Sequence, residues 1–425
     1  MTPDISALAR SKVDKSAYIW EFERVQTFTF TEPRFPRRRE DVLDAAMTAL
    51  REKPWARLEG VPETEAALKS FHGGGLPWFI SSGTASLMAL LLGHEIGPGD
   101  EVITTPYTWG ATISAILTVG AIPVFADIQR ENALLDPATV EAKISPKTKA
   151  VLCVHLFGHA CDMTKLRTIT RKHGLLLFED GSQAHGAKWQ DRVVGLEGDG
   201  AAFSCMGMKL LAGTEGGYAL FTKPDPLEKA SLYGKHPRGM SADRVAVLQE
   251  QGLLDALQLG WRPCVVSAAL VKANLPYLNG EITARRSNAQ RLRENLKGQK
   301  AVCLPEEETG ATGCYHLLSL VFDPAEGAPP RAVVHERLQK AGLGGFIYIP
   351  TPMHRLKRLN PHEYEGPRVF WHEALRQAGV DYRETHCPAA EWRSEHSLEF
   401  SFNWTEEAPE AMDQMAEILL ESVKS

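Results

Sequence analysis

Short apolar runs alternate with amphipathic stretches through the middle of the chain. Apolar runs bounded by Gly and polar residues predict buried strands, whereas apolar positions at three- and four-residue spacing predict helices. The predicted strands are 78–81, 101–105, 122–126, 150–155, 175–178, 201–204 and 218–221. Helical spacing lies between several of them, as in 85–92 and 163–173. This alternation predicts an α/β fold with a mainly parallel seven-stranded sheet that helices cover on both faces.

The N-terminal segment has a different pattern. Residues 1–39 are mixed and punctuated by prolines, and we expect an arm that packs on the body or on a partner subunit, with a short strand at 27–31. Helical spacing begins at 39–50 and returns at 63–71. These helices open the predicted large domain, residues 40–280.

The C-terminal part predicts a second, smaller domain. A long helical pattern rich in Arg and Asn covers 274–297, and we place the domain boundary near it, which gives a small domain of residues 281–425. The elements predicted there are strands 316–322, 346–349 and 398–402 and helices 331–341 and 409–422. Together they indicate an α+β unit.

Size and charge narrow the function classes. The 425 residues include 47 basic and 53 acidic side chains, a formal net charge of −6, and 44% are hydrophobic. A chain of this size predicts two packed domains, and its charge offers no general basic surface for nucleic acid. The run Arg37-Arg38-Arg39 is the local exception, and we interpret it as a solvated helix start.

Cysteine usage and hydropathy predict a cytoplasmic protein. The seven cysteines are odd in number and scattered, without a Cys-x-x-Cys pair, at positions 153, 161, 205, 264, 303, 314 and 387. This pattern favours a reducing compartment over a disulfide framework or a zinc cluster, and we expect no metal site. Since no apolar run approaches ~18 residues, we expect no membrane span.

Two other enzyme classes lack their motifs. His372-Glu373 begins a zinc-protease pattern, but position 376 is Arg instead of the second His. Gly195, Gly198 and Gly200 have the wrong order for a dinucleotide-binding fingerprint, and the chain has no P-loop.

The most informative stretch runs from residue 175 to residue 217. Its first apolar run ends in Glu179-Asp180, and Lys209 follows the next predicted strand, 201–204. An Asp and a Lys about 30 residues apart could form an ordinary surface ion pair. However, the ends of parallel strands are where α/β folds place their chemistry. The spacing therefore makes Asp180 and Lys209 candidate site residues.

The motifs around these two residues carry a resemblance. Asp180 begins the sequence Asp-Gly-Ser-Gln-Ala-His-Gly, Ser204 precedes Lys209 by five residues, and the Gly-rich segment 213–217 follows. This arrangement resembles the DegT/StrS family of pyridoxal-phosphate-dependent sugar aminotransferases, with similarity in recognisable order over residues 40–297. The resemblance implies the type I aminotransferase fold and pyridoxal 5′-phosphate as cofactor.

The chemistry of that cofactor explains the two residue types. A lysine amine condenses with the cofactor aldehyde, and a carboxylate facing the pyridine nitrogen keeps this nitrogen protonated, so that the ring can accept electrons. By resemblance, Lys209 is the catalytic lysine and Asp180 is the carboxylate.

A phosphate site is expected where the first strand of the sheet ends. Ser82-Gly83-Thr84 precedes the helix 85–92, and backbone N–H groups at a helix N-terminus bind phosphate. From the residues alone, a plain Ser/Thr cap is the alternative. The resemblance places the cofactor phosphate at Gly83 and Thr84, and also at the hydroxyl of Ser204, which could instead be a buried serine satisfied by backbone.

Trp109 and Gln183 are the remaining cofactor candidates. Trp109 follows the second strand in Pro106-Tyr107-Thr108-Trp109, where the family has an aromatic ring that stacks on the pyridine. A core role is the alternative for this ring. Gln183 occupies the position at which the family binds the ring hydroxyl of the cofactor, whereas His185 could be a supporting partner or a core histidine.

One segment departs from the family pattern. The family usually has Gly-x-Asn-Tyr-Arg after the lysine, and its asparagine reaches the phosphate in the neighbouring subunit's site. Here the nearest match is Leu-Gly-Trp-Arg-Pro at 259–263, without the asparagine. The resemblance therefore implies a homodimer with active sites at the interface, but does not supply this cross-subunit contact.

The implied reaction moves an amino group from glutamate or glutamine to a keto-sugar or keto-cyclitol. Segments 203–205, 348–352 and 360–362 are similar to inosose aminotransferases of aminoglycoside antibiotic pathways, and nucleotide-linked keto-sugars are the rival substrates. Two other classes compete: a sugar dehydratase of the same family, in which histidine replaces the lysine, and a non-catalytic regulator that keeps the ligand pocket. Lys209 argues against the first, and the intact set of Lys209, Asp180 and Gln183 argues against the second.

Overall fold

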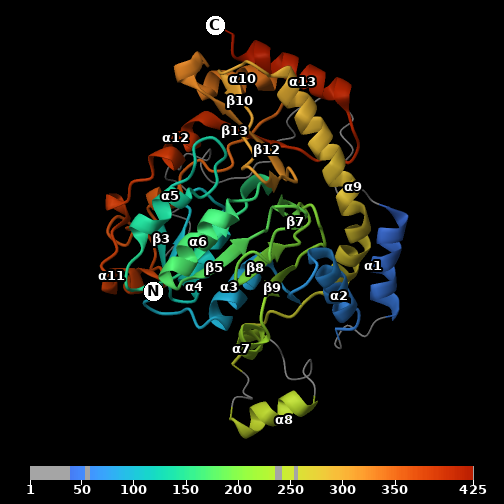
Figure 1. Ribbon diagram of the computed structural model, residues 1–425, viewed down its shortest axis with the longest axis vertical. Helices are drawn as coiled ribbons and strands as arrows, with labels where there is room; N and C mark the ends of the chain where they lie inside the picture. Colours follow the sequence, from blue (N-terminus) through green and yellow to red (C-terminus); the bar gives the residue numbers. More distant parts are fainter. Residues whose placement is uncertain (1–38, 53–57, 235–241, 253–256, 425) are drawn as a thin grey trace, which may run out of the picture.

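The computed structural model describes residues 39–52, 58–234, 242–252 and 257–424 (Figure 1). The strand predicted at 27–31, and all but the last residue of the predicted arm, lie outside these ranges.

A seven-stranded sheet forms the centre of the molecule and confirms the predicted fold class. Its strands are β1 (Leu76–Ile80), β2 (Glu101–Thr104), β3 (Ile122–Phe125), β4 (Thr148–Val154), β5 (Leu176–Asp180), β8 (Gly200–Ser204) and β9 (Gly217–Phe221). Their spatial order is β1-β9-β8-β5-β4-β2-β3. Strand β9 runs antiparallel to both of its neighbours, and the other pairs are parallel. The seven predicted strand segments therefore each correspond to one strand of this sheet.

Helices cover both faces of the sheet because successive strand residues point to opposite sides. These helices are α2 (Val61–His72), α3 (Gly83–Gly93), α4 (Gly110–Thr118), α6 (Met163–His173), α7 (Pro224–Gly234) and α9 (Val265–Asn295). Phe178 and Phe221 share one apolar cluster with residues of α3, α4 and α7. Leu177 and Leu220 face the other side, where α2, α6 and α9 contribute to the second cluster. The sheet is thus buried on both faces, as its continuous apolar strands require.

Several further helices lie outside this sandwich. They are α1 (Glu40–Glu52), which packs along α9, the short α5 (Pro137–Val140), and α8 (Ala242–Glu250). Figure 1 shows α8 set apart from the rest of the molecule, beyond α7. Among the described residues, no helix is both long enough and apolar enough to cross a bilayer.

A smaller antiparallel sheet lies at the other end of the molecule (Figure 1). It consists of β10 (Val302–Cys303), β12 (Leu317–Phe322) and β13 (Ser397–Ser401), in that order. Together with α10 (Arg331–Lys340), α13 (Pro409–Ser422) and the last turns of α9, these strands enclose a separate apolar cluster. This unit corresponds to the predicted α+β part. A third, minor sheet joins β6 (Lys188–Trp189), β7 (Arg192–Val193) and β11 (Ala311–Thr312), which the sequence pattern did not predict.

The predicted strand at 346–349 is wrong. Only Phe346 pairs with β13, through an isolated bridge to Glu399. Two residues later, the N–H of Tyr348 donates to the Glu399 carboxylate at 2.8 Å instead of to a backbone carbonyl. A side-chain carboxylate thus replaces the backbone acceptor that a neighbouring strand would supply. Pro350 and Pro352 follow, and they have no backbone N–H to donate to a neighbouring strand.

The chain crosses between the two sheets more than once. Helix α9 is continuous through residues 280 and 281, where the domain boundary was predicted. Further on, the segment with α11 (His372–Gln377) and α12 (Pro388–His396) returns to the large sheet. There the Tyr382 hydroxyl donates to the Pro123 carbonyl at 2.8 Å, and the Met353 N–H donates to Pro106 at the same distance. The division into residues 40–280 and 281–425 stays a prediction.

A tight junction joins the loop after β4 to the start of β12. Gly158 has φ +93°, and its carbonyl accepts the Cys314 N–H at 2.8 Å. A Cβ on Gly158 would lie 2.7 Å from the Cys314 sulfur and 2.8 Å from the His316 nitrogen. Glycine is therefore required at this position for both conformation and space.

Replacing Gly158 with alanine should lower the free energy of unfolding by about 1–3 kcal/mol, since the new methyl group meets backbone atoms in a close-packed region. Urea unfolding curves would measure this loss. Gly174→Ala is the matched control: Gly174 has φ +64°, but a Cβ added there would have nothing within 4 Å. This control should lose only the free energy needed to hold alanine at a positive φ, about 1 kcal/mol. Equal losses in the two variants would contradict the predicted steric conflict.

Candidate active site

Six strands of the large sheet end at the same edge. Strands β2, β3, β4, β5 and β8 are parallel, and β1 runs parallel to them because the antiparallel β9 separates β1 from β8. This edge therefore collects the residues that follow each strand: Gly83 after β1, Trp109 after β2, Asp180 at the end of β5 and Ser204 at the end of β8. These are four of the predicted site residues.

Lys209 lies in the loop that connects β8 to β9. Backbone hydrogen bonds close this loop at its base, from the Cys205 N–H to Gly216 at 2.8 Å and from the Gly213 N–H to Cys205 at 2.7 Å. Nearer the tip, the Lys209 N–H donates to Met206 at 2.8 Å. These bonds hold the backbone of Lys209 next to the sheet edge. Burial lowers the pKa of Lys209 to about 8, although the Asp180 carboxylate partly opposes this shift.

Asp180 is buried and its carboxylate is oriented by two donors. The Thr112 hydroxyl donates to Oδ2 at 2.8 Å, and the Ser182 N–H donates to Oδ1 at 3.1 Å. Each carboxylate oxygen has further lone pairs for a cationic partner. Thr112 was not predicted. The available signal was its spacing, since it lies four residues after Thr108 on α4, and the two hydroxyls are 3.0 Å apart.

The start of α3 is pressed against the end of β8. Ser82 caps this helix by accepting the Ala85 N–H at 3.1 Å. A Cβ on Gly83 would lie 2.7 Å from the Ser204 Cβ, so no larger residue fits between the helix and the strand. The glycine therefore brings the positive end of α3 next to the Ser204 hydroxyl. The cap interpretation of Ser82 is confirmed, whereas the phosphate role of Gly83 and Thr84 stays a prediction.

Gln183 and Trp109 both meet a residue that the sequence pattern did not single out, Tyr348. The Gln183 side chain accepts the Phe157 N–H at 2.8 Å and donates to the Tyr348 hydroxyl at 2.6 Å. The Trp109 ring lies 5.7 Å from the Tyr348 ring, and 45% of the Trp109 side chain is exposed. Tyr348 could not be found from spacing because it follows Gln183 by 165 residues and lies in the segment wrongly predicted as a strand.

Trp261 and His185, two residues that the sequence analysis discussed, both lie in the core. Trp261, in the segment that departs from the family pattern, is buried against Gly234 and packs edge to face with Trp78. It therefore belongs to the core around β1. His185 is fully buried beside Phe203, and burial lowers its pKa to about 3, as expected for a neutral core histidine.

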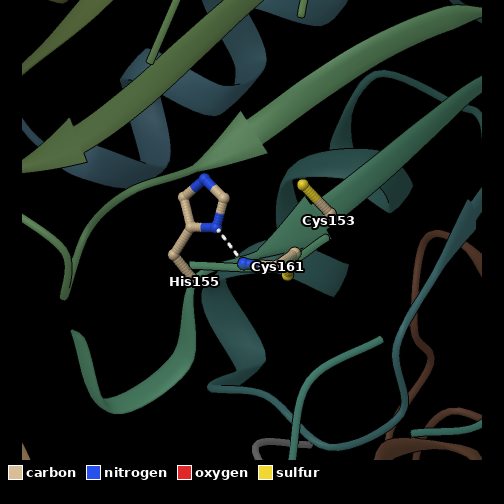
Figure 2. A group of neighbouring side chains, drawn as sticks. All are labelled: Cys153, His155 and Cys161. Atoms are coloured by element: carbon tan, nitrogen blue, oxygen red, sulfur yellow. Dashed lines mark hydrogen bonds between the residues drawn. The ribbon is translucent and has the colours of Figure 1, made fainter. Parts of the chain in front are cut away.

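A buried cluster beneath this edge contains three residues of metal-ligand type, Cys153, His155 and Cys161, whose ligand atoms lie within 4.8 Å of one another (Figure 2). The scattered cysteine positions did not predict this group. However, His155 Nδ1 accepts the Cys161 N–H at 3.1 Å, and Nε2 contacts the Glu179 carboxylate at 3.0 Å. Because both imidazole nitrogens are engaged, the ring offers no lone pair to a metal. The group is better explained as support for Glu179, which also accepts three backbone N–H groups.

The residues at the edge fit an aldehyde cofactor that carries a phosphate. They offer an amine of lowered pKa, a buried carboxylate, a helix start with a glycine at its closest approach, and an exposed aromatic ring. Fold and site together define an enzyme of the type I aminotransferase class, which binds its cofactor covalently through a lysine.

The comparisons agree with this class. The model of the DegT/DnrJ/EryC1/StrS aminotransferase family matches residues 36–373, and the chain belongs to this family. The family is pyridoxal-phosphate-dependent, so the protein is a pyridoxal-phosphate-dependent aminotransferase.

Named relatives act on sugars and cyclitols. The chain is 33% identical over 327 residues to the UDP-N-acetyl-3-dehydro-alpha-D-glucosamine 3-aminotransferase of Acidithiobacillus ferrooxidans, covering 77% of this chain and 78% of the relative. It is 36% identical over 340 residues to the L-glutamine:2-deoxy-scyllo-inosose aminotransferase of Streptoalloteichus tenebrarius, covering 76% and 79%. Among solved structures, the putative sugar aminotransferase Spr1654 from Streptococcus pneumoniae, in its PMP form, is similar with a TM-score of 0.76 at 21% identity, covering 93% and 98%. This last likeness supports the fold.

The lowered pKa of Lys209 predicts how the rate of cofactor attachment depends on pH. In protein freed of cofactor, the neutral amine should become available near pH 8 instead of near the ordinary lysine value of 10.5. The rate at which added pyridoxal phosphate forms its visible absorbance band should rise with pH around a midpoint near 8, because the unprotonated amine is the nucleophile. In Asp180→Asn protein the midpoint should move down, since the opposing carboxylate charge is lost. A midpoint above 10 would contradict the burial of this amine.

Proposed function

We propose that this aminotransferase moves an amino group from glutamine or glutamate to a keto-cyclitol, and that Lys209 is its catalytic lysine. The observation that carries the proposal is that Lys209 and the buried Asp180 lie at one sheet edge and interact electrostatically: burial lowers the pKa of the amine, and the Asp180 carboxylate partly opposes this shift. The identity of 36% to a glutamine-dependent inosose aminotransferase over three quarters of the chain supports the donor and the ketone class.

Each proposed site residue has one task. When bound, the cofactor supplies an electron sink for the carbon that gains or loses the amine. Lys209 holds it covalently at rest and carries a proton to and from that carbon when it is released. Asp180 keeps the pyridine nitrogen protonated, and the N–H groups at Gly83 and Thr84, with the Ser204 hydroxyl, bind the phosphate.

The rings and amides complete the proposed site. Trp109 covers one face of the pyridine, and Gln183 binds the ring hydroxyl. We also propose a cytoplasmic homodimer whose partner covers this edge. Its support is the exposure of the apolar side chain of Met208, 57%, directly beside Lys209 in the sequence.

A substrate screen tests the proposal. The amino form of the loaded enzyme is mixed with keto-cyclitols and, separately, with nucleotide-linked keto-sugars, and return of the visible aldehyde band is followed. We expect return with an inosose and with glutamine as the donor that restores the amino form. Return only with nucleotide-linked keto-sugars would favour the substrate class of the Acidithiobacillus relative instead. No return with any ketone would overturn the substrate proposal.

A further inference from the structure

Tyr348 reaches the active-site edge from the segment between α10 and α11, which runs beside β13. Its ring lies 5.6 Å from the Phe157 ring and 5.7 Å from the Trp109 ring, measured between centroids. Its backbone is fixed from behind by the Glu399 carboxylate, which accepts the Tyr348 N–H at 2.8 Å. Glu399 is itself fully buried and accepts the Ser319 hydroxyl at 2.9 Å. The tyrosine is therefore held on the aromatic side of the site by a rigid support.

The hydrogen bonds of Gln183 fix the role of the Tyr348 hydroxyl. The Phe157 backbone N–H can only donate, so the side-chain atom of Gln183 that faces it, at 2.8 Å, must be the carbonyl oxygen Oε1. The amide nitrogen Nε2 then points to the Tyr348 hydroxyl, 2.6 Å away, and donates to it. Because the tyrosine oxygen accepts this bond, its own proton is available to another acceptor.

Burial and the neighbouring carboxylates keep the Tyr348 hydroxyl protonated. Burial raises the pKa of Tyr348 well above its ordinary value, and the Asp180 and Glu399 carboxylates raise it further. These are the charged groups that act on the hydroxyl from β5 and β13. The Tyr348 hydroxyl is thus a proton donor over the whole working pH range.

We infer that Tyr348 is a positioning residue for the ring hydroxyl of the cofactor. This inference rests on the proposed function, in which Gln183 faces that hydroxyl. Tyr348 holds the Gln183 amide in one orientation and adds a second donor on the same side of the ring. With the cofactor bound, two donors from Gln183 and Tyr348 would stabilise negative charge on the ring oxygen and so lower the pH at which the cofactor changes its protonation form. The wild-type cofactor band should therefore change form at a lower pH than it would without this tyrosine.

The test compares Tyr348→Phe with wild type as loaded enzymes, by recording the visible absorbance of the bound cofactor between pH 5 and pH 10. Removing the donor should raise the pH midpoint of the spectral change by about one unit, the size expected for one hydrogen bond to a charged group. Amino-group transfer at pH 7.5 should fall about tenfold. The phenylalanine keeps the ring contacts, and urea unfolding checks that the fold is retained.

Tyr382→Phe is the matched control. The Tyr382 hydroxyl donates to the Pro123 carbonyl at 2.8 Å, and its ring packs on Phe125 away from Gln183. Its removal should leave the midpoint within the error of wild type. Equal midpoints in Tyr348→Phe and wild type would overturn the inference and leave the proposed function intact. A wild-type protein that forms no cofactor band would instead overturn the assignment of the site itself.

Discussion

Replacing Lys209 with alanine is expected to abolish amino-group transfer and the visible band of the bound cofactor together. The rate should fall by about 10⁴-fold, because one side chain supplies both the covalent attachment and the proton carrier. The protein should still fold, since the loop that holds Lys209 is closed by backbone hydrogen bonds at Cys205 and Gly213. Absorbance spectra and single-turnover assays with glutamine would measure the loss.

Lys149→Ala is the control for this substitution. Lys149 lies on β4 with its side chain exposed, so its removal should change neither the band nor the rate. A band of normal intensity in Lys209→Ala protein would show that the cofactor is attached elsewhere and would reject Lys209 as the catalytic lysine. Loss of activity in both variants would point to a general defect.

Replacing Asp180 with asparagine should have the second largest effect. The amide is of nearly equal size and can still accept the Thr112 hydroxyl, which now donates to Oδ2 at 2.8 Å. What is lost is the negative charge that keeps the pyridine nitrogen protonated. An opposite charge nearby shifts a pKa by about 1–3 units, so transfer should fall by about 10- to 10³-fold. Steady-state rates with saturating cofactor would measure this.

A cofactor analogue tests whether Asp180 acts through the charge on the ring nitrogen. Pyridoxal phosphate methylated at the ring nitrogen carries a permanent positive charge and should restore part of the rate to Asp180→Asn, but not to Lys209→Ala. The control is Asp199→Asn, because Asp199 accepts the Leu177 N–H at 3.0 Å near the opposite end of β5. Its activity should match wild type. Failure of the analogue to restore any activity would separate Asp180 from the ring nitrogen.

The large sheet could be predicted because its signal is local. Each of its strands is a short apolar run, and each run ends at Gly or a polar residue, as at Asp180. The details that failed depend on tertiary contacts. Helix α9 begins at Val265, ahead of the predicted 274, because its first turns pack on the sheet core. The expected strand at 346–349 lost its ladder to the carboxylate of Glu399, 51 residues further on from Tyr348.

Some residues of the candidate site could likewise be predicted from the sequence, and others could not. Gly83 and Trp109 were predicted because they follow recognisable strand ends and match the family motif; the strand ends alone left a helix cap and a core ring as alternatives. The structure brings Gly83 against Ser204, whereas the roles proposed for both toward a phosphate stay predictions. Thr112 and Tyr348 were missed because their partners, Asp180 and Gln183, lie 68 and 165 residues away. Contacts over such separations leave no pattern in a single sequence.

The dependence of Tyr348 on Glu399 has a consequence for biosynthesis. Lys209, Asp180 and Gln183 all leave the ribosome long before β13 (Ser397–Ser401). Until that strand has emerged and paired with β12, the backbone N–H of Tyr348 lacks its Glu399 acceptor. A nascent chain therefore carries its reactive amine before its site is assembled, and selective capture of the vitamin-derived aldehyde awaits the synthesis of β13.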